Sequence, residues 1–193
     1  MNERFAQLHA PIQARRSGRA FAKTPLSPDD VALLLEAARW AESCFNLQPW
    51  RYVAVTQPDE LEALQGALAG GNAWAKAAPL LLAVVTREDL DKTTEDGRRY
   101  DLFDTGLSVQ NLVLQAVSMG LNCHLMAGFN PDKARQALNI PEDFTVICLV
   151  AVGYPGDPAT LADDELRQRE AAPRERKPLE HIASFERWDE RLG

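Results

Sequence analysis

Two continuous apolar runs restrict most strongly what this chain can fold into. Segments 79–86 (PLLLAVVT) and 144–152 (FTVICLVAV) are apolar at almost every position. A strand with one face in water alternates apolar and polar residues, so a strand without alternation is usually covered on both faces. We therefore expect two buried strands with helices packed on each side of the sheet, which is a layered helix–sheet–helix domain.

Helical patterns separate these runs. Ser27, followed by Pro28 and two aspartates, is a typical helix start, and apolar residues recur at helical spacing after it. The longest helical pattern spans 100–119 and is followed by Gly120, which suits a helix C-terminus. Further helices are predicted at 58–68 and 130–139, and strands at 50–56 and 123–127. These patterns predict one domain over residues 1–193.

The composition changes after Gly153. Prolines and charged residues then dominate, and apolar residues return only near the end, at Phe185 and Trp188. We expect 154–193 to be an extended C-terminal tail that packs on the domain or wraps around a partner subunit.

Charge and hydropathy exclude several classes of protein. The formal net charge of −7 argues against a nucleic-acid partner, which requires a cationic face. The apolar runs are too short to span a bilayer, and the first residues lack the apolar core of a secretory signal. Three cysteines without CxxC spacing suit a reducing compartment. We expect a cytoplasmic protein without a membrane partner.

The sequence has no self-sufficient catalytic motif. It lacks HExxH, GxGxxG, GxxxxGK[ST] and GxSxG. The three histidines, His9, His124 and His181, do not have metal-ligand spacing. We therefore predict no metal site and no catalytic side chain, and we expect a bound cofactor to supply the chemistry.

Two basic clusters are candidate phosphate ligands. Arg15, Arg16, Ser17 and Arg19 lie within five residues of an otherwise acidic chain, and a second cluster contains Arg174 and Arg176. Arginine binds phosphate through paired donors. The two clusters could meet at one phosphate, although a solvated basic turn would have the same composition.

Two further segments have polar or flexible residues suited to a ring-shaped ligand. Segment 43–50 (SCFNLQPW) offers amide donors and acceptors for the edge of a flavin pyrimidine ring, although an ordinary loop would also fit. Gly128 follows an apolar strand, where a glycine permits the backbone to approach a ligand closely or forms a plain turn.

Taken together, these segments resemble the nitroreductase family of FMN-dependent oxidoreductases. Residues 15–21 (RRSGRAF) are similar to its RRSxRxF signature, and residues 43–50 are similar to its SxxNxQPW signature. The helix at 100–119, the glycine turns at 128 and 153, and the basic motif at 176–179 (RKPL) follow in the family's order. The resemblance covers residues 15 to 179.

The resemblance implies an α+β fold, a three-layer α/β/α sandwich, in a homodimer with FMN at the subunit interface. It also implies roles for individual residues, which fall into three groups. The phosphate and ribityl end would be held by Arg15, Arg16, Ser17, Arg19, Arg174 and Arg176. The other subunit would contribute Ser43, Asn46 and Gln48. The ring would lie near Asn72, Met126, Ala127 and Gly128.

The reaction that the resemblance implies has two steps. Hydride passes from NADH or NADPH to flavin N5, and a small acceptor such as a nitroaromatic or a quinone then takes the electrons from the flavin. Some family members have an acidic residue where Ala127 stands, so the hydrogen bonding near N5 differs here. Alternatives with the same cofactor are flavin fragmentation, dehalogenation and non-catalytic flavin storage. A protein-docking patch without a cofactor is the remaining alternative.

Overall fold

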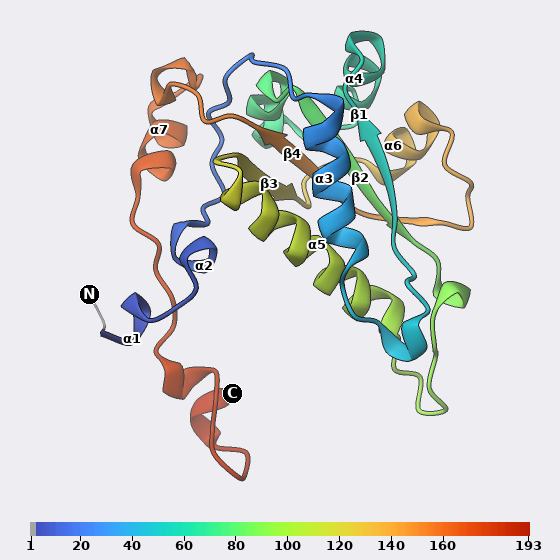
Figure 1. The fold of residues 1–193 in the computed structure, drawn as a ribbon, viewed down its shortest axis with the longest axis vertical. Coiled ribbons are helices and arrows are strands. Elements are labelled where there is room, and N and C mark those ends of the chain that lie inside the picture. The colour runs from blue at the N-terminus through green and yellow to red at the C-terminus, as the bar shows by residue number, and fades with distance from the viewer. Residues whose placement is uncertain (1–2) are drawn as a thin grey trace.

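A four-stranded antiparallel sheet forms the centre of the computed structural model, which describes residues 3–193 (Figure 1). Its strands are β1 (Arg51–Val55), β2 (Leu80–Thr86), β3 (Asn122–Met126) and β4 (Thr145–Gly153). They lie in the order β1-β2-β4-β3, so the two apolar runs form the inner pair. Every residue of β2 is buried, as expected for a strand covered on both faces.

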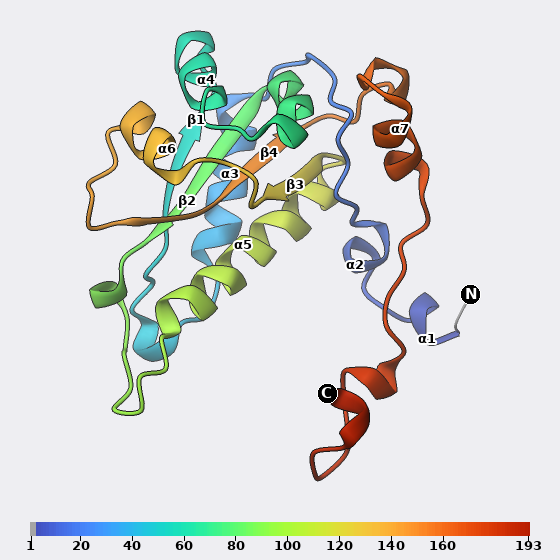
Figure 2. The same cartoon turned by 180° about the vertical axis from the view of Figure 1, so that it is seen from behind.

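Helices cover both faces of this sheet. α3 (Pro28–Arg39) and α5 (Tyr100–Ser118) pack on one face. α4 (Pro58–Gln65), the 3₁₀ segment η2 (Gly70–Ala77) and α6 (Pro131–Leu138) pack on the other. α3 therefore lies in front of the sheet in Figure 1 and behind it in Figure 2. The predicted three-layer sandwich is confirmed.

Alternate residues of the inner strands supply two separate cores. Leu80, Leu82 and Val84 face α3 and α5, whereas Leu81 and Ala83 face α4, η2 and α6. This follows from the two-residue period of a strand, which directs neighbouring side chains to opposite faces. Because both cores are apolar, β2 has no position for a water-exposed residue.

The helix boundaries follow the local signals in the sequence. Asp30 N–H donates to Ser27 Oγ at 3.0 Å, and the Asp30 carboxylate accepts from Ser27 N–H at 3.2 Å, which completes a capping box before α3. α5 ends just before Gly120, which has a φ of 74° that favours glycine. Both predicted boundaries are confirmed.

The terminal segments lie together beside the sheet. α1 (Glu3–Ala6) and α2 (Ala10–Ala14) precede the basic turn, and the tail contains α7 (Asp164–Ala171). α7 makes the tail partly helical, and the segment that follows α7 extends past α2 and α1 (Figure 1). The Asp163 carboxylate caps α7 by accepting from Leu166 N–H at 2.8 Å. The sequence did not predict this helix, because prolines and charged residues dominate the tail.

Short 3₁₀ turns connect these elements. They are η1 (Cys44–Asn46), η3 (Glu88–Leu90), η4 (Pro158–Thr160), η5 (Leu179–His181) and η6 (Glu190–Leu192). The side chains of Phe185 and Trp188 are 91% and 77% exposed, so within one chain they do not anchor the tail. None of the helices within residues 3–193 is long and apolar enough to cross a membrane.

Truncation of a side chain between β2 and its covering helices tests the two-sided core. Leu82→Ala is expected to lower the free energy of unfolding by about 2–5 kcal/mol, because it leaves a cavity under α3 and α5. Urea unfolding measures this change. Leu33→Ala on the exposed face of α3 is the control and should change stability by less than about 0.5 kcal/mol. Equal effects of the two substitutions would contradict the assignment of Leu82 to the core.

Candidate functional site

A cavity of about 540 Å³ lies between the basic turn after α2 and the segment that follows α7. It brings together two groups of residues about 150 positions apart in the sequence. The residues predicted for the phosphate end all line it: Arg15, Arg16, Ser17, Arg19, Arg174 and Arg176. The two basic clusters therefore meet in one place, as the sequence suggested.

Backbone carbonyls position two of these arginines. The Arg174 guanidinium donates to the carbonyl oxygens of Ile12 at 3.2 Å and Arg15 at 2.5 Å, and it also donates to the Gln13 carbonyl. The Arg16 guanidinium donates to carbonyl oxygens of α7 and the residue after it. These bonds attach the tail to the basic turn and orient the guanidiniums without neutralising them.

The cavity concentrates positive charge. No ion pair among the described residues includes Arg15, Arg174 or Arg176. Burial lowers the pKa of Arg15, and the charges of Arg174 and Arg176 lower it further. Neighbouring guanidiniums that repel one another bind a dianion favourably, since it relieves the repulsion and accepts paired hydrogen bonds.

The acidic residue that lines this cavity is Glu170, near the end of α7. Its carboxylate accepts from Arg19 N–H at 2.8 Å and from Ala20 N–H at 3.4 Å. These two adjacent backbone donors form a small anion-binding turn. Glu170 therefore occupies a position that a phosphate oxygen could also use. Sequence reasoning missed it because the local pattern does not show which face of α7 meets the turn.

Arg169 is a second lining residue that was not predicted. It lines the same cavity and pairs with Glu165 at 2.5 Å on the surface of α7. It also borders a neighbouring cavity of about 670 Å³, and Arg19 borders both. The two cavities are therefore adjacent compartments.

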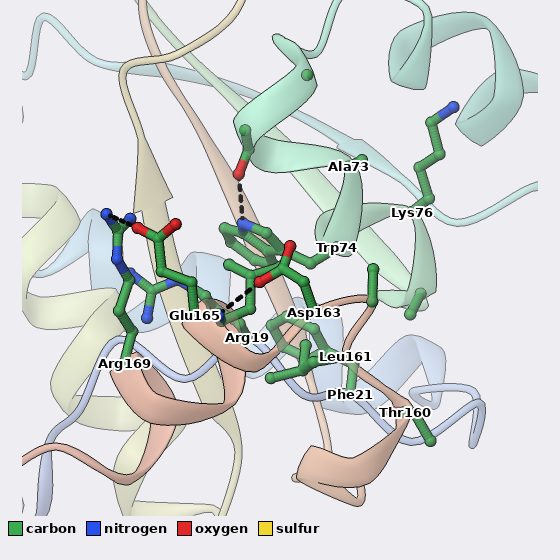
Figure 3. Close-up of a pocket in the computed structure, with 15 residues that line it drawn as sticks. Arg19, Phe21, Ala73, Trp74, Lys76, Thr160, Leu161, Asp163, Glu165 and Arg169 are labelled. Carbon is green, nitrogen blue, oxygen red and sulfur yellow. Dashed lines mark hydrogen bonds and ion pairs between the residues drawn. The ribbon is translucent and has the colours of Figure 1, made fainter.

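Trp74 forms the floor of this second cavity (Figure 3). The Arg19 guanidinium carbon lies 5.9 Å from the centre of the indole ring, and Phe21 stacks on the ring with a centroid distance of 6.2 Å. Indole Nε1–H donates to the Gly71 carbonyl at 3.0 Å. Residues of α7 close the opposite side, so the cavity has an aromatic wall and a charged rim.

His124 is packed behind this wall. Its ring lies 4.4 Å from the Trp74 ring, and Nδ1 lies 3.1 Å from the Gly18 carbonyl oxygen, which can only accept. Burial lowers the pKa of His124, so the ring is neutral at pH 7 and Nδ1 carries the proton. Within residues 3–193, no group of three His, Cys, Asp or Glu side chains could hold a metal ion.

Asn72 and Gly128 lie against each other near the second cavity. Asn72 Nδ2 donates to the Gly128 carbonyl at 2.8 Å. A Cβ atom at Gly128 would lie 2.8 Å from that same nitrogen, so the glycine is needed for the contact. Ala127 and Gly128 are both exposed. The close approach at Gly128 in this structure is to Asn72, and the approach to a ligand stays a prediction.

Met126 does not lie on the exposed side of β3. Its side chain is 2% exposed and belongs to the core that faces α4, η2 and α6, so any contact of Met126 with a ring would come from its backbone. The physical reason is strand alternation, which directs neighbouring residues to opposite faces. Leu125, at 42% exposure, is the neighbouring residue that faces outward.

Ser43, Asn46 and Gln48 lie at a different place in the single chain. They line neither of the two cavities. Their loop lies at the N-terminal end of α5, whereas α2 lies near the other end of that helix (Figure 1). Phe45, in the middle of the loop, is 81% exposed. Within one protomer, the loop and the cationic cavity are therefore separate.

Comparisons with known proteins find one family model and several relatives that match this chain. The sequence model described as the nitroreductase family matches residues 12–87 and 67–154. An NADH dehydrogenase of Thermus thermophilus is 29% identical over 87% of this chain and 90% of its own length. A 5,6-dimethylbenzimidazole synthase of Rhodospirillum rubrum is 29% identical over 77% of this chain and 82% of its own length. A crystal structure described as an oxidoreductase containing FMN has a TM-score of 0.84 and 32% identity, and covers 94% of this chain and 93% of that one.

Removal of the negative charge of Glu170 should tighten the binding of a phosphate-bearing ligand. We expect Glu170→Gln to lower the dissociation constant for FMN roughly fivefold, by about 1 kcal/mol, because the ligand no longer faces a carboxylate. Fluorescence titration measures this constant. Glu175→Gln makes the same charge change at a residue that does not line the cavity. If both variants bound FMN equally, the proposed competition at the Arg19 and Ala20 N–H groups would be wrong.

Proposed function

This chain belongs to the nitroreductase family, and we propose that it binds FMN across the two adjacent cavities as a homodimer that reduces a small electrophilic acceptor. It is an oxidoreductase that uses FMN with NADH or NADPH. The solved structure described as containing FMN has 32% sequence identity to this chain, which supports FMN as the cofactor.

The observation that carries the proposal is the convergence of unpaired arginines in the first cavity. The guanidiniums of Arg15, Arg174 and Arg176 repel one another, and a phosphate monoester would relieve that repulsion. Ser17 adds a hydroxyl beside Arg15, at 3.3 Å from its guanidinium. These donors suit the phosphate and the adjoining ribityl hydroxyl groups.

Residues around the second cavity suit the ring of the cofactor. Arg19 borders both cavities and would contact the ring where it leaves the phosphate compartment. The Asn72 amide lies beside exposed backbone at Gly128, and it offers a donor and an acceptor to a pyrimidine edge. Ala127 has no side-chain acceptor for N5, so backbone groups would supply the hydrogen bonding there.

Bound FMN would supply the redox chemistry, since flavin N5 accepts hydride from a reduced nicotinamide and the flavin then passes electrons to a second substrate. The chain has to hold the ring, exclude water and align the two substrates in turn. No side chain has to act as a nucleophile, which fits the absence of a catalytic motif in the sequence.

Assembly as a homodimer would complete the site. Ser43, Asn46 and Gln48 lie away from the cavities of their own chain, so they could reach a flavin only in a partner subunit. Exposed apolar side chains support such an interface, with Phe103 at 62%, Ile182 at 64% and Phe185 at 91% exposure. The tail, which leaves its own domain, would pack against the partner.

A second candidate is flavin fragmentation, in which the bound flavin is the substrate. The observation that favours it is the similarity to a 5,6-dimethylbenzimidazole synthase, whose name denotes a synthase and not a reductase. Turnover of nicotinamide with quinones or nitroaromatics would support the reductase. Loss of the flavin absorbance in oxygen after reduction, with a new aromatic product, would support the second candidate.

Loss of one of these unpaired arginines should weaken cofactor binding. We expect Arg15→Ala to raise the dissociation constant of FMN by about 10-fold to 100-fold, because a charge-assisted hydrogen bond contributes about 1.5–3 kcal/mol. Riboflavin, which lacks the phosphate, should bind both proteins with similar affinity. Lys23→Ala removes an exposed cation outside the cavity and is the matched control. Unchanged FMN affinity in Arg15→Ala would overturn the phosphate assignment.

The purified protein should show a flavin absorption spectrum that bleaches under anaerobic NADH or NADPH. The measurement is a visible spectrum before and after addition of each nicotinamide, followed by addition of a quinone to restore the oxidised spectrum. A flavin that binds but does not bleach would contradict the reductase and favour storage. A protein that takes up no FMN would contradict the cofactor site.

A further inference from the structure

The loop that carries Ser43, Asn46 and Gln48 has a strained backbone. Phe45, Asn46 and Gln48 have φ values of 50°, 57° and 51°, in the left-handed region that favours glycine. This conformation is sterically unfavourable for residues other than glycine. Three such residues within four positions keep this conformation only if other contacts hold the loop in place.

Bonds within the loop supply part of that restraint. Ser43 Oγ accepts from Gln48 N–H at 2.9 Å, and the Gln48 side-chain amide donates to the Asn46 carbonyl oxygen at 3.0 Å. These bonds connect the loop residues to one another. They do not fix the loop relative to the helices, because both partners of each bond move together.

Two side chains attach the loop to the body of the domain. The exposed Arg51, at the start of β1, donates to the Gln48 carbonyl oxygen at 3.0 Å, and the second attachment is to a buried carboxylate. Cys44 N–H donates to Asp104 Oδ2 at 2.6 Å, and Asp104 lies on α5 with 2% of its surface exposed. A carboxylate acceptor makes this a charge-assisted bond, which is stronger than a bond between neutral groups. α5 packs against the central sheet, so it is a rigid point of attachment.

The surroundings of Asp104 are acidic. Asp101, on the same helix, is 1% exposed and pairs with Arg99 at 2.8 Å. Asp91 is 9% exposed, and its Oδ2 has no hydrogen-bond partner among the described residues. Burial raises the pKa of Asp91, and the carboxylates of Asp104 and Asp101 raise it further.

We propose that Asp104 is a positioning residue: through Cys44 N–H, its carboxylate holds the strained 43–48 loop in the conformation that contacts the flavin of the partner subunit. This inference rests on the proposed function, because the loop has a flavin to contact only if the homodimer binds FMN. Asp104 would not touch the flavin and would act only through the loop backbone. A side chain far from the cationic cavity would therefore control the affinity for the cofactor.

Three variants of the full-length protein separate positioning from general stability. Asp104→Leu removes the acceptor, whereas Asp104→Asn keeps an amide oxygen that can accept from Cys44 N–H. Ser108→Ala is the matched control on the same helix: Ser108 is fully buried and bonds to the Ala38 carbonyl at 2.9 Å and the Tyr52 hydroxyl at 2.8 Å, away from the loop. Ser108→Ala removes buried hydrogen bonds but leaves the bond from Cys44 N–H to Asp104 intact.

The first readout needs no cofactor. Alkylation of Cys44 by iodoacetamide, followed by peptide mass spectrometry, reports how freely the loop moves. Cys123 is an internal reference, because it is buried and burial raises the pKa of its thiol to about 12. We expect the alkylation rate of Cys44 to rise at least fivefold in Asp104→Leu and to stay near the wild-type rate in Asp104→Asn and Ser108→Ala.

The second readout is the affinity for FMN, measured by fluorescence titration. Asp104→Leu should weaken binding about tenfold, the effect of losing one hydrogen bond to a charged group. Asp104→Asn and Ser108→Ala should bind within about twofold of the wild type. An effect of Asp104→Leu no larger than that of Ser108→Ala would overturn the inference, and so would equal losses in Asp104→Leu and Asp104→Asn.

A variant on the loop side covers the case in which Asp104→Leu does not fold. Cys44→Pro deletes the donor N–H, and the extended Ser43 backbone, at φ −152° and ψ 157°, is compatible with a following proline. It should weaken FMN binding about as much as Asp104→Leu, and the double variant should lose no more than either single variant. Full affinity in Cys44→Pro would overturn the inference.

The two proposals fail in different ways. If the wild-type protein binds no FMN, the proposed function fails and the flavin role of the loop fails with it. If wild-type protein binds FMN but the Cys44 alkylation rate is unchanged in Asp104→Leu, the proposed function stands and the attachment by Asp104 is wrong.

Discussion

The burial of β2 and β4 on both faces is the constraint on which the rest of the structure depends. Every residue of β2 is buried, and β4 is buried from Leu149 to Gly153, so helices must cover the sheet on each side. One of those helices, α5, runs across the sheet and brings the N-terminal residues and the 43–48 loop to its two ends (Figure 1). The two regions proposed for cofactor binding are thus attached to a single rigid element.

The cationic cavity illustrates how a strongly acidic chain can provide a site for an anion. The net charge of −7 describes the whole surface, whereas the cavity collects arginines from two distant segments. Backbone carbonyls hold Arg16 and Arg174, which orients their charges without cancelling them. Glu170 is the local exception, since its carboxylate occupies two backbone donors in the basic turn. In the proposed site, binding of a phosphate would therefore depend on the balance between these arginines and one internal anion.

Rigidity and strain have complementary roles at the other end of α5. The 43–48 loop adopts a backbone that most side chains disfavour, and its attachment to a buried carboxylate offsets that strain. A loop held in this way is pre-organised, so less conformational entropy is lost when a ligand binds. The same buried carboxylate would destabilise the domain if it had no partner. The Asp104 carboxylate therefore gains a hydrogen-bond partner from the same loop that it is proposed to position.

Local patterns in the sequence were sufficient for the layers and for one part of the site. Continuous apolar runs predicted β2 and β4, the Ser27 capping signal predicted the start of α3, and the clustered arginines predicted the cationic cavity. These features depend on short-range chemistry: the side-chain period, helix caps, and the affinity of guanidinium groups for phosphate.

Only the tertiary structure decided which side chains face the site. Met126 is buried while Leu125 is exposed, because the face of β3 that meets the core depends on how the whole sheet is covered. Glu170 and the Asp104 contact to Cys44 join segments about 150 and 60 residues apart, and no local pattern encodes such pairs. The sequence by itself determined the elements and the chemistry of the basic turn. The tertiary structure decided which distant groups meet, because contacts between distant segments arise only when the complete core is packed.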